Sequence, residues 1–250
     1  MIMDYFRPQT LNEALTLLTQ PNTVPLGGGT LLTALKTDSV KVVDLQALGL
    51  DSVNKKGNEL EIGATVTLQQ LFNSQYCQTA MKSALKLEAP LNIRNSATVA
   101  GTLVASDGRS PFATALLAMD AKIEQAIFDN SRIEYRISNI GEYLPLRSTN
   151  LITKITILLN TKLAFECVSR THADKPIICA VLTQWSSGRT RLALGGYGKS
   201  PILAMDGTEA DGLDSAARNA YHEANDDWAS AEYRMDVAAT LAKRCLENIA

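Results

Sequence analysis

Two short stretches decide the fold: residues 93–103, IRNSATVAGTL, and residues 24–31, VPLGGGTL. Both combine small residues with hydroxyl groups, and the second has three consecutive glycines between apolar segments. A backbone without Cβ atoms brings its N–H groups close to an anion, as phosphate-binding loops do. Neither stretch has the GxGxxG or GxxxxGK(S/T) pattern of the best-defined nucleotide loops. The glycine stretch fits a dinucleotide pyrophosphate, and taken alone it also fits a tight turn without a ligand. Residues 93–103 suit a phosphate or a ribityl chain, and taken alone they also fit a buried small-residue turn that packs two subdomains.

Regular elements are predicted on both sides of these stretches. Thr10 is a plausible N-cap for a short amphipathic helix that ends before Pro21. Helical periodicity runs from Leu68 to Leu87, and Pro90 stops it. The segments KVVDL and ELEIGATVT are typical of short strands. The N-terminal part therefore has the mixed pattern of an α+β protein.

The pattern restarts near residue 161 with short β-rich segments, and helical segments follow Gly212. We therefore expect a domain boundary near Asn160. The expected domains are 1–160, divided into subdomains at about 1–57 and 58–160, and 161–250.

Composition excludes several classes of partner. Of the 250 residues, 46% are hydrophobic and 20% are charged, and the formal net charge is −2. A net charge this small gives no long-range positive field. We therefore expect neither nucleic acid nor a membrane surface as a partner. The first residues lack a secretory signal pattern, and no apolar run reaches the ~18 residues that suggest a membrane span. We expect a cytoplasmic protein.

The cysteines and histidines do not predict a metal site. The four cysteines are far apart and form no CxxC pair, and the two histidines, His172 and His222, have no metal-ligand spacing. We therefore expect no metal ligands and no iron–sulfur cluster in this chain.

Six collinear segments resemble the flavin subunits of the xanthine dehydrogenase and carbon monoxide dehydrogenase family, also called molybdopterin dehydrogenases. The similar segments are YFRPQTLNEALTLL (5–18), PLGGGTLL (25–32), KVVDLQAL (41–48), LEIGATVTLQQL (60–71), IRNSATVAGTL (93–103) and ASAEYRMDVAATLAKRCL (229–246). The resemblance implies an α+β fold. A two-subdomain FAD-binding fold of the vanillyl-alcohol-oxidase (PCMH) type would be followed by a smaller α/β C-terminal domain of the CO-dehydrogenase flavoprotein type.

The resemblance also implies a role in a larger complex. FAD would be the cofactor of this chain, whereas molybdopterin and iron–sulfur clusters would belong to a large and a small partner subunit. Electrons would pass from the iron–sulfur subunit through FAD to an external acceptor. The redox chemistry would belong to the cofactor, so no catalytic side chain is named.

The family's FAD-contacting positions carry over onto two loops and one carboxylate. The first loop gives Leu26, Gly27, Gly28, Gly29, Thr30 and Leu31; the second gives Thr98, Gly101 and Thr102; and Asp107 follows. The chain departs from the family where Ala100 replaces a usual glycine and Thr102 a usual asparagine. Pro111 stands where an aspartate is common, and Asp107 is the nearby carboxylate.

These departures leave alternatives to the electron-transfer subunit. One is a degenerate member of the family that binds FAD weakly or not at all and acts as a structural or assembly subunit. A standalone flavin oxidase is disfavoured, because the sequence has no second constellation for a substrate.

Overall fold

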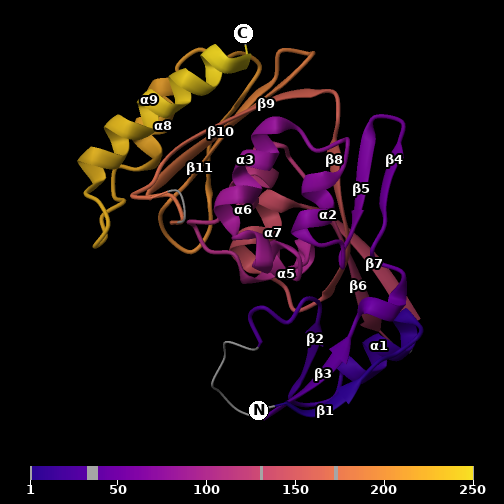
Figure 1. Cartoon of the computed structure of the whole chain (residues 1–250). Coiled ribbons are helices and arrows are strands. Elements are labelled where there is room, and N and C mark those ends of the chain that lie inside the picture. Colours follow the sequence, from indigo (N-terminus) through magenta and orange to yellow (C-terminus); the bar gives the residue numbers. More distant parts are fainter. Residues whose placement is uncertain (1, 33–38, 130–131, 172–173, 250) are drawn as a thin grey trace.

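The computed structural model describes residues 2–32, 39–129, 132–171 and 174–249. Three sheets and the helices between them build the molecule, with the N-terminal sheet at one end and the last two helices at the other (Figure 1). No helix in these described ranges is long and apolar enough to span a membrane.

The N-terminal sheet has three parallel strands in the order β1-β3-β2. Its elements are β1 (Ile2–Phe6), α1 (Leu11–Leu18), β2 (Thr23–Leu26), β3 (Val40–Asp44) and the 3₁₀ helix η1 (Gln46–Leu48). The predicted cap of α1 is confirmed, because the Thr10 hydroxyl accepts a hydrogen bond from the Glu13 N–H at 3.2 Å. Ala14 and Leu15 of this helix are buried, and they share a core cluster with the five-stranded sheet.

The central part is a five-stranded sheet in the order β4-β5-β8-β6-β7, with every pairing antiparallel. Its strands are β4 (Val53–Lys56), β5 (Glu59–Gly63), β6 (Lys122–Asp129), β7 (Arg132–Asn139) and β8 (Leu151–Leu158). The helices are α2 (Leu68–Asn73), α3 (Thr79–Glu88), α4 (Leu91–Arg94), α5 (Val99–Ala105), α6 (Pro111–Ala118) and α7 (Ile140–Leu146). Alternate residues such as Leu60, Ile62 and Ile155 are buried and join the helices in one core.

The helical periodicity predicted from Leu68 to Leu87 is divided between two helices in the structure. Helix α2 ends at Asn73, because Ser74 takes an extended conformation with φ −61° and ψ 137°. Helix α3 begins at Thr79. Apolar spacing predicted the buried face correctly, but it did not reveal this interruption.

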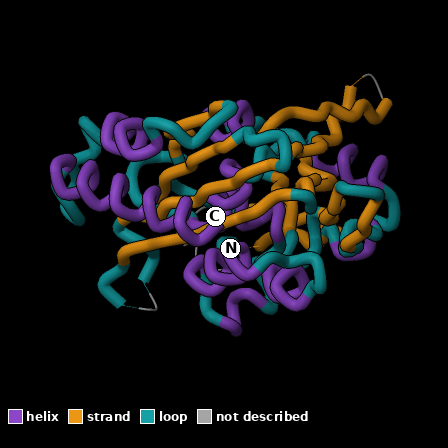
Figure 2. Tube along the Cα trace, turned by 90° about the horizontal axis from the view of Figure 1, so that it is seen from above, coloured by secondary structure: helices purple, strands orange, loops and turns teal. Residues whose placement is uncertain are grey.

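The C-terminal sheet has four antiparallel strands in the order β12-β11-β10-β9. Its elements are β9 (Thr161–Val168), β10 (Ile178–Trp185), β11 (Thr190–Gly195), β12 (Ile202–Gly207), α8 (Leu213–Ala220) and α9 (Ala231–Ile249). One face packs against α3 and α6, and the other against α8 and α9 (Figures 1 and 2). Every residue of α6 is buried, since the helix packs against the C-terminal sheet and against α3 and α7.

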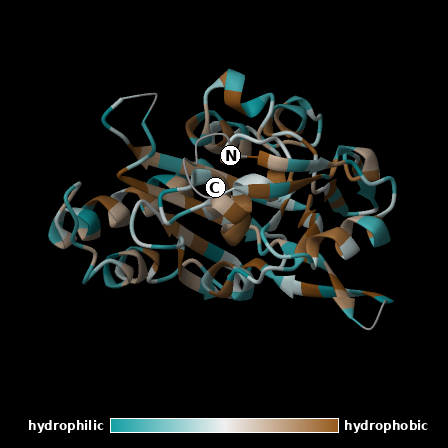
Figure 3. Ribbon diagram, turned by 90° about the horizontal axis from the view of Figure 1, so that it is seen from below, coloured by the Kyte–Doolittle hydropathy of each residue, from teal (hydrophilic) through white to brown (hydrophobic). Residues whose placement is uncertain are grey.

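The core follows these layers. In Figure 3 hydrophobic segments lie mainly in the strands and helices of the interior, whereas many outer turns are hydrophilic. Buried residues form three clusters, and the largest extends from the five-stranded sheet through the central helices to Val181 and Ala193 of the C-terminal sheet. The predicted division at residue 160 falls in the turn between β8 and β9, whereas β4 lies within 1–57 but pairs with β5. The domain division stays a prediction.

An ion-pair network holds the end of α6 to the C-terminal sheet. Arg191 in β11 lies 2.9 Å from a carboxylate oxygen of Asp120 and 2.9 Å from one of Asp206. It also donates a hydrogen bond to the Leu117 carbonyl at 3.2 Å. Arg189 contacts the same two carboxylates, and its hydrogen bond is the main reason why the pKa of Asp206 lies below its ordinary value. The arginines differ in burial, with side chains 6% exposed for Arg191 and 39% for Arg189.

We predict that Arg191→Met lowers the free energy of unfolding by about 3 kcal/mol, because it leaves a buried network without its central cation. Arg189→Met removes an exposed cation from the same carboxylates and should cost less than about 1 kcal/mol. Urea denaturation of both variants measures the difference. Equal losses would contradict the assignment of Arg191 as the buried centre of this network.

Candidate FAD-binding site

The first glycine loop begins where β2 leaves its sheet. The Leu26 carbonyl accepts a hydrogen bond from the Leu45 N–H at 3.0 Å, and this is the last link before the glycines. Gly29 takes a left-handed conformation with φ +71°, which glycine adopts without strain. Within the described residues, the N–H groups of Gly27, Gly28 and Thr30 donate to no protein acceptor. The loop therefore presents unpaired donors from a short run of backbone.

The first loop lies directly against the second. A Cβ atom on Gly28 would lie 1.7 Å from the Ser96 carbonyl oxygen, and one on Gly27 would lie 2.8 Å from the Thr98 hydroxyl oxygen. No side chain fits at Gly28 unless one of the two backbones moves. The structure thus joins the two stretches that the sequence singled out, and it gives Gly28 a packing reason to be glycine.

The second loop forms the start of α5, and the N–H groups of the first turn of that helix are already used. Thr98 is the N-cap, and its hydroxyl accepts from the Gly101 N–H at 3.1 Å. The Val99 N–H donates to Val66 and the Ala100 N–H to Ala64, at 2.8 and 3.3 Å. The Thr102 N–H donates to the Thr98 carbonyl at 2.8 Å. The first turn of α5 therefore offers no free backbone donor to a bound anion, whereas the first loop does.

The predicted site residues fall into two places. Gly27 and Gly28 lie against Thr98 and Ser96 at the start of α5. Thr102 of that helix is half-buried, and Leu31 is 51% exposed. Asp107 lies beyond the other end of α5, a helix of 7 residues that is about 10 Å long. Its carboxylate accepts from the Arg109 N–H at 3.0 Å and lies 3.5 Å from the Lys175 amine. Asp107 is thus separated from the glycine loops, and its role stays a prediction.

Two of the departing residues point into the core. Ala100 is 9% exposed and belongs to the central cluster. Pro111 is buried in the first turn of α6, where the Glu88 carboxylate accepts from the Ser110 hydroxyl and the Phe112 N–H at 2.6 and 3.1 Å. Burial raises the pKa of Glu88. An aspartate at position 111 would stand beside this carboxylate instead of facing a ligand.

Sequence reasoning missed Arg147, which joins three segments near the end of α5. It takes a left-handed φ of +43°, unusual for a residue other than glycine. Its guanidinium donates to the carbonyls of Val104 at 3.0 Å and Lys199 at 3.1 Å. A single arginine after a helix belongs to no recognisable motif, so only the structure reveals this role.

A further glycine cluster, residues 195–198, fixes the loop that carries Asp107. It forms the turn at the end of β11. The Gly108 N–H donates to the Gly198 carbonyl at 3.0 Å, and the Gly196 N–H donates to the Gly108 carbonyl at 2.7 Å. A Cβ atom on Gly108 would lie 1.8 Å from the Tyr197 carbonyl oxygen, so this approach also requires glycine.

Among the described residues, no three His, Cys, Asp or Glu side chains gather as a metal site. His222 has an exposed side chain and lies next to Glu223, and His172 lies outside the described residues.

Comparison with known proteins identifies the family. The sequence profile described as the FAD binding domain in molybdopterin dehydrogenase matches residues 1–159, more than half of the chain. The uncharacterized protein YgfM of Escherichia coli K12 is 28% identical over 250 residues, covering 96% of this chain and 94% of its own length. The nicotinate dehydrogenase FAD-subunit of Eubacterium barkeri is 29% identical over 131 residues, covering 48% of this chain and 44% of that subunit.

The fold is also found among solved structures. A chain of the Cu,Mo-CO dehydrogenase, in its cyanide-inactivated form, matches with a TM-score of 0.84 and 23% identity, covering 100% of this chain and 98% of that one. The predicted fold class, an FAD-binding fold of the PCMH type followed by a C-terminal domain, is confirmed. The chain belongs to the FAD-binding family of molybdopterin dehydrogenases, which are oxidoreductases.

Proposed function

We propose that this chain is the electron-transfer subunit of a heteromeric molybdenum hydroxylase. It receives electrons from an iron–sulfur subunit and passes them through FAD to an external acceptor, while a molybdopterin-binding large subunit oxidises the substrate. The observation that carries the proposal is the first glycine loop, whose unpaired N–H groups lie against the start of α5. When bound, FAD supplies the redox chemistry, and the protein supplies binding and orientation.

The diphosphate of FAD is assigned to the first loop. The N–H groups of Gly27, Gly28 and Thr30 bind its oxygens, since these donors have no acceptor within the described chain. The other predicted positions have supporting roles. Leu26, Gly29 and Leu31 shape the loop, and Thr98 and Gly101 support it from α5. Thr102 faces the ligand with its hydroxyl. Asp107, beyond the far end of α5, serves another part of the extended cofactor.

The chain's own cysteines do not supply an electron relay. Burial raises the thiol pKa of Cys77 to about 11, and those of Cys179 and Cys245 to about 12. Within the described part of the chain, no three His, Cys, Asp or Glu side chains gather where they could hold a metal ion. Electrons therefore arrive from a separate chain, which is why the proposal includes an iron–sulfur partner.

A structural or assembly subunit without stable FAD is the second candidate. The observation that favours it is the engagement of every first-turn donor of α5 with protein acceptors. Flavin absorbance of the purified protein and its FAD dissociation constant separate the two candidates.

We predict that Gly28→Ala weakens FAD binding at least about tenfold, because moving the loop away from Ser96 misplaces donors of ~1 kcal/mol each. The matched control is Gly141→Ala, where the added Cβ has an ordinary contact of 3.7 Å with Leu117. Fluorescence titration with FAD measures affinity, and thermal unfolding of the apoproteins checks that both variants fold. Unchanged affinity in a folded Gly28→Ala protein would contradict the assignment of the loop.

Thr102→Asn is expected to raise FAD affinity roughly fivefold, because the longer amide can add one hydrogen bond of about 1 kcal/mol. The matched control is Thr240→Asn, which makes the same change at an exposed position of α9 and should leave FAD affinity unchanged. The same titration measures both variants. A gain at neither position would place Thr102 outside the FAD site.

The isolated chain with FAD should accept electrons from dithionite but should not oxidise a purine or an aldehyde. Bleaching of flavin absorbance measures the first reaction, and anaerobic mixing with each substrate measures the second. Substrate turnover should require co-expression with iron–sulfur and molybdopterin-binding subunits. Turnover by the chain alone would overturn the electron-transfer proposal.

A further inference from the structure

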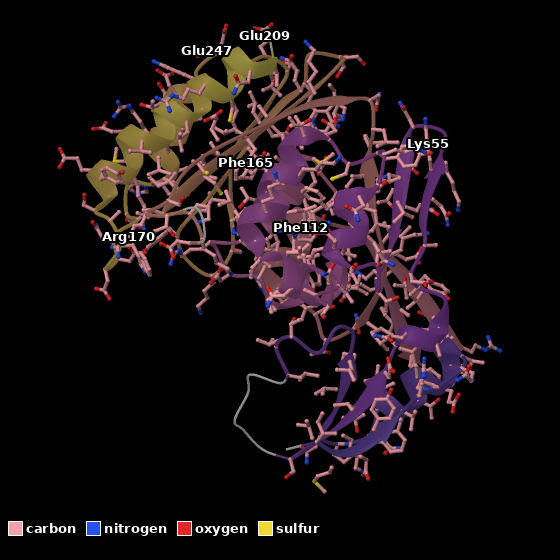
Figure 4. All side chains as sticks on the ribbon, in the orientation of Figure 1. Lys55, Phe112, Phe165, Arg170, Glu209 and Glu247 are labelled. Atoms are coloured by element: carbon pink, nitrogen blue, oxygen red, sulfur yellow. The ribbon has the colours of Figure 1, made fainter. Side chains whose placement is uncertain are left out.

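Two arginines stack on one exposed tryptophan at the start of α9. The guanidinium carbon of Arg109 lies 3.9 Å from the centroid of the Trp228 ring, and that of Arg170 lies 4.6 Å from it. Trp228 is 41% exposed, and Tyr233 in the first turn of α9 is 44% exposed. We call Arg109, Arg170 and Trp228 the arginine–aromatic surface, and Tyr233 follows Trp228 by five residues. Figure 4 shows Arg170 near the beginning of α9, at the opposite end of the helix from Glu247.

A fully buried arginine holds the loop that carries Trp228. The Arg234 guanidinium donates to both carboxylate oxygens of Asp226, at 2.8 and 3.0 Å, and to the carbonyls of Ala224 and Ala229. Asp226 in turn accepts from the Trp228 N–H at 2.8 Å. The position of the tryptophan is thus fixed before any partner binds, which reduces the entropy lost on association.

The cations of this surface have no carboxylate partner among the described residues. Arg109 donates to the carbonyls of Lys175 and Pro176, at 2.8 and 3.2 Å. Arg170 is exposed, and its recorded contact is the Trp228 ring. The nearby carboxylates of Asp107 and Glu88 both face Lys175. The planar donor edge of Arg170 therefore remains free for a carboxylate from outside, which arginine binds with two parallel hydrogen bonds.

The surface adjoins Asp107, the carboxylate predicted to contact FAD, through one short loop. Arg109 follows Asp107 by two residues, and Gly108 between them is bonded to Gly196 and Gly198. The chain that delivers electrons must approach the flavin. We therefore take that chain as the partner that binds this surface. Exposed tryptophan, tyrosine and arginine are also the residue types that contribute most to protein–protein binding.

We propose that the arginine–aromatic surface is the docking point for an acidic segment of the iron–sulfur subunit, with a partner carboxylate bound to Arg170. This proposal rests on the proposed function, because it takes the electron-donating chain as the partner. Trp228 supplies apolar contact area, and Arg109 stacks on the tryptophan ring.

Charge reversal tests the proposal on the full-length chain loaded with FAD. Arg170→Glu should weaken binding to the iron–sulfur subunit at least about tenfold, because the partner carboxylate would then face a like charge. The matched control is Arg244→Glu, which makes the same change in charge on an exposed residue near the other end of α9. Its dissociation constant should stay within about twofold of the wild type, and isothermal titration at low and moderate salt measures all three proteins.

Equal effects of the two reversals, or no binding of the wild-type chain to the iron–sulfur subunit, would overturn the docking proposal. FAD affinity is measured on the same samples and should be unchanged in both variants. Absence of FAD binding in the wild type would instead contradict the proposed function. The two failures are therefore distinguishable.

Discussion

The close contact between Gly28 and the Ser96 carbonyl fixes how the N-terminal sheet meets the rest of the protein. A Cβ atom at Gly28 would lie 1.7 Å from that oxygen, so only backbone without a side chain allows the approach. Thr98, two residues after Ser96, forms a β-bridge with Thr67 and caps α5. The contact therefore sets the glycine loop, with its unpaired N–H groups, at a defined place beside the first turn of a buried helix. A diphosphate site built from backbone depends on this placement more than on any single side chain.

The far end of α5 is held by a different kind of interaction. Arg147 donates to backbone carbonyls at the end of α5 and in the turn after β11, and Gly108 exchanges hydrogen bonds with that same turn. Arg109 and Arg234 likewise donate to carbonyls from segments distant in sequence. Because guanidinium groups have several donors in a rigid plane, each one joins loops that have few apolar contacts of their own. The helix thus lies between a glycine contact at one end and arginine contacts at the other, and the proposed cofactor site and docking surface share this framework.

Much of the fold could be predicted from the sequence, because local signals were strong. The cap at Thr10 and the stop at Pro90 depend on neighbours in the chain, and the glycine stretches resemble a known family. The rest depends on contacts between distant residues. No local pattern shows that the carbonyls of Ala64 and Val66 accept hydrogen bonds from the first N–H groups of α5. Nor does any local pattern place Asp107 away from the glycine loops. The candidate site was therefore predicted as a set of residues, whereas the division of its donors between the two loops required the structure.

The surroundings of the three departing residues show that they differ in how much they can affect FAD binding. Ala100 and Pro111 are buried, and the N-terminus of α6 beside Pro111 already has the Glu88 carboxylate as its acceptor. Neither Ala100 nor Pro111 has a polar side-chain group that could face the first glycine loop. Thr102 is only half-buried, so it is the position at which a lost amide could reduce cofactor affinity. A shorter side chain there removes at most a few hydrogen bonds, each contributing about 1 kcal/mol, while the backbone donors of the first loop are independent of it. The altered residues are therefore compatible with a retained FAD site whose affinity rests mainly on glycine backbone.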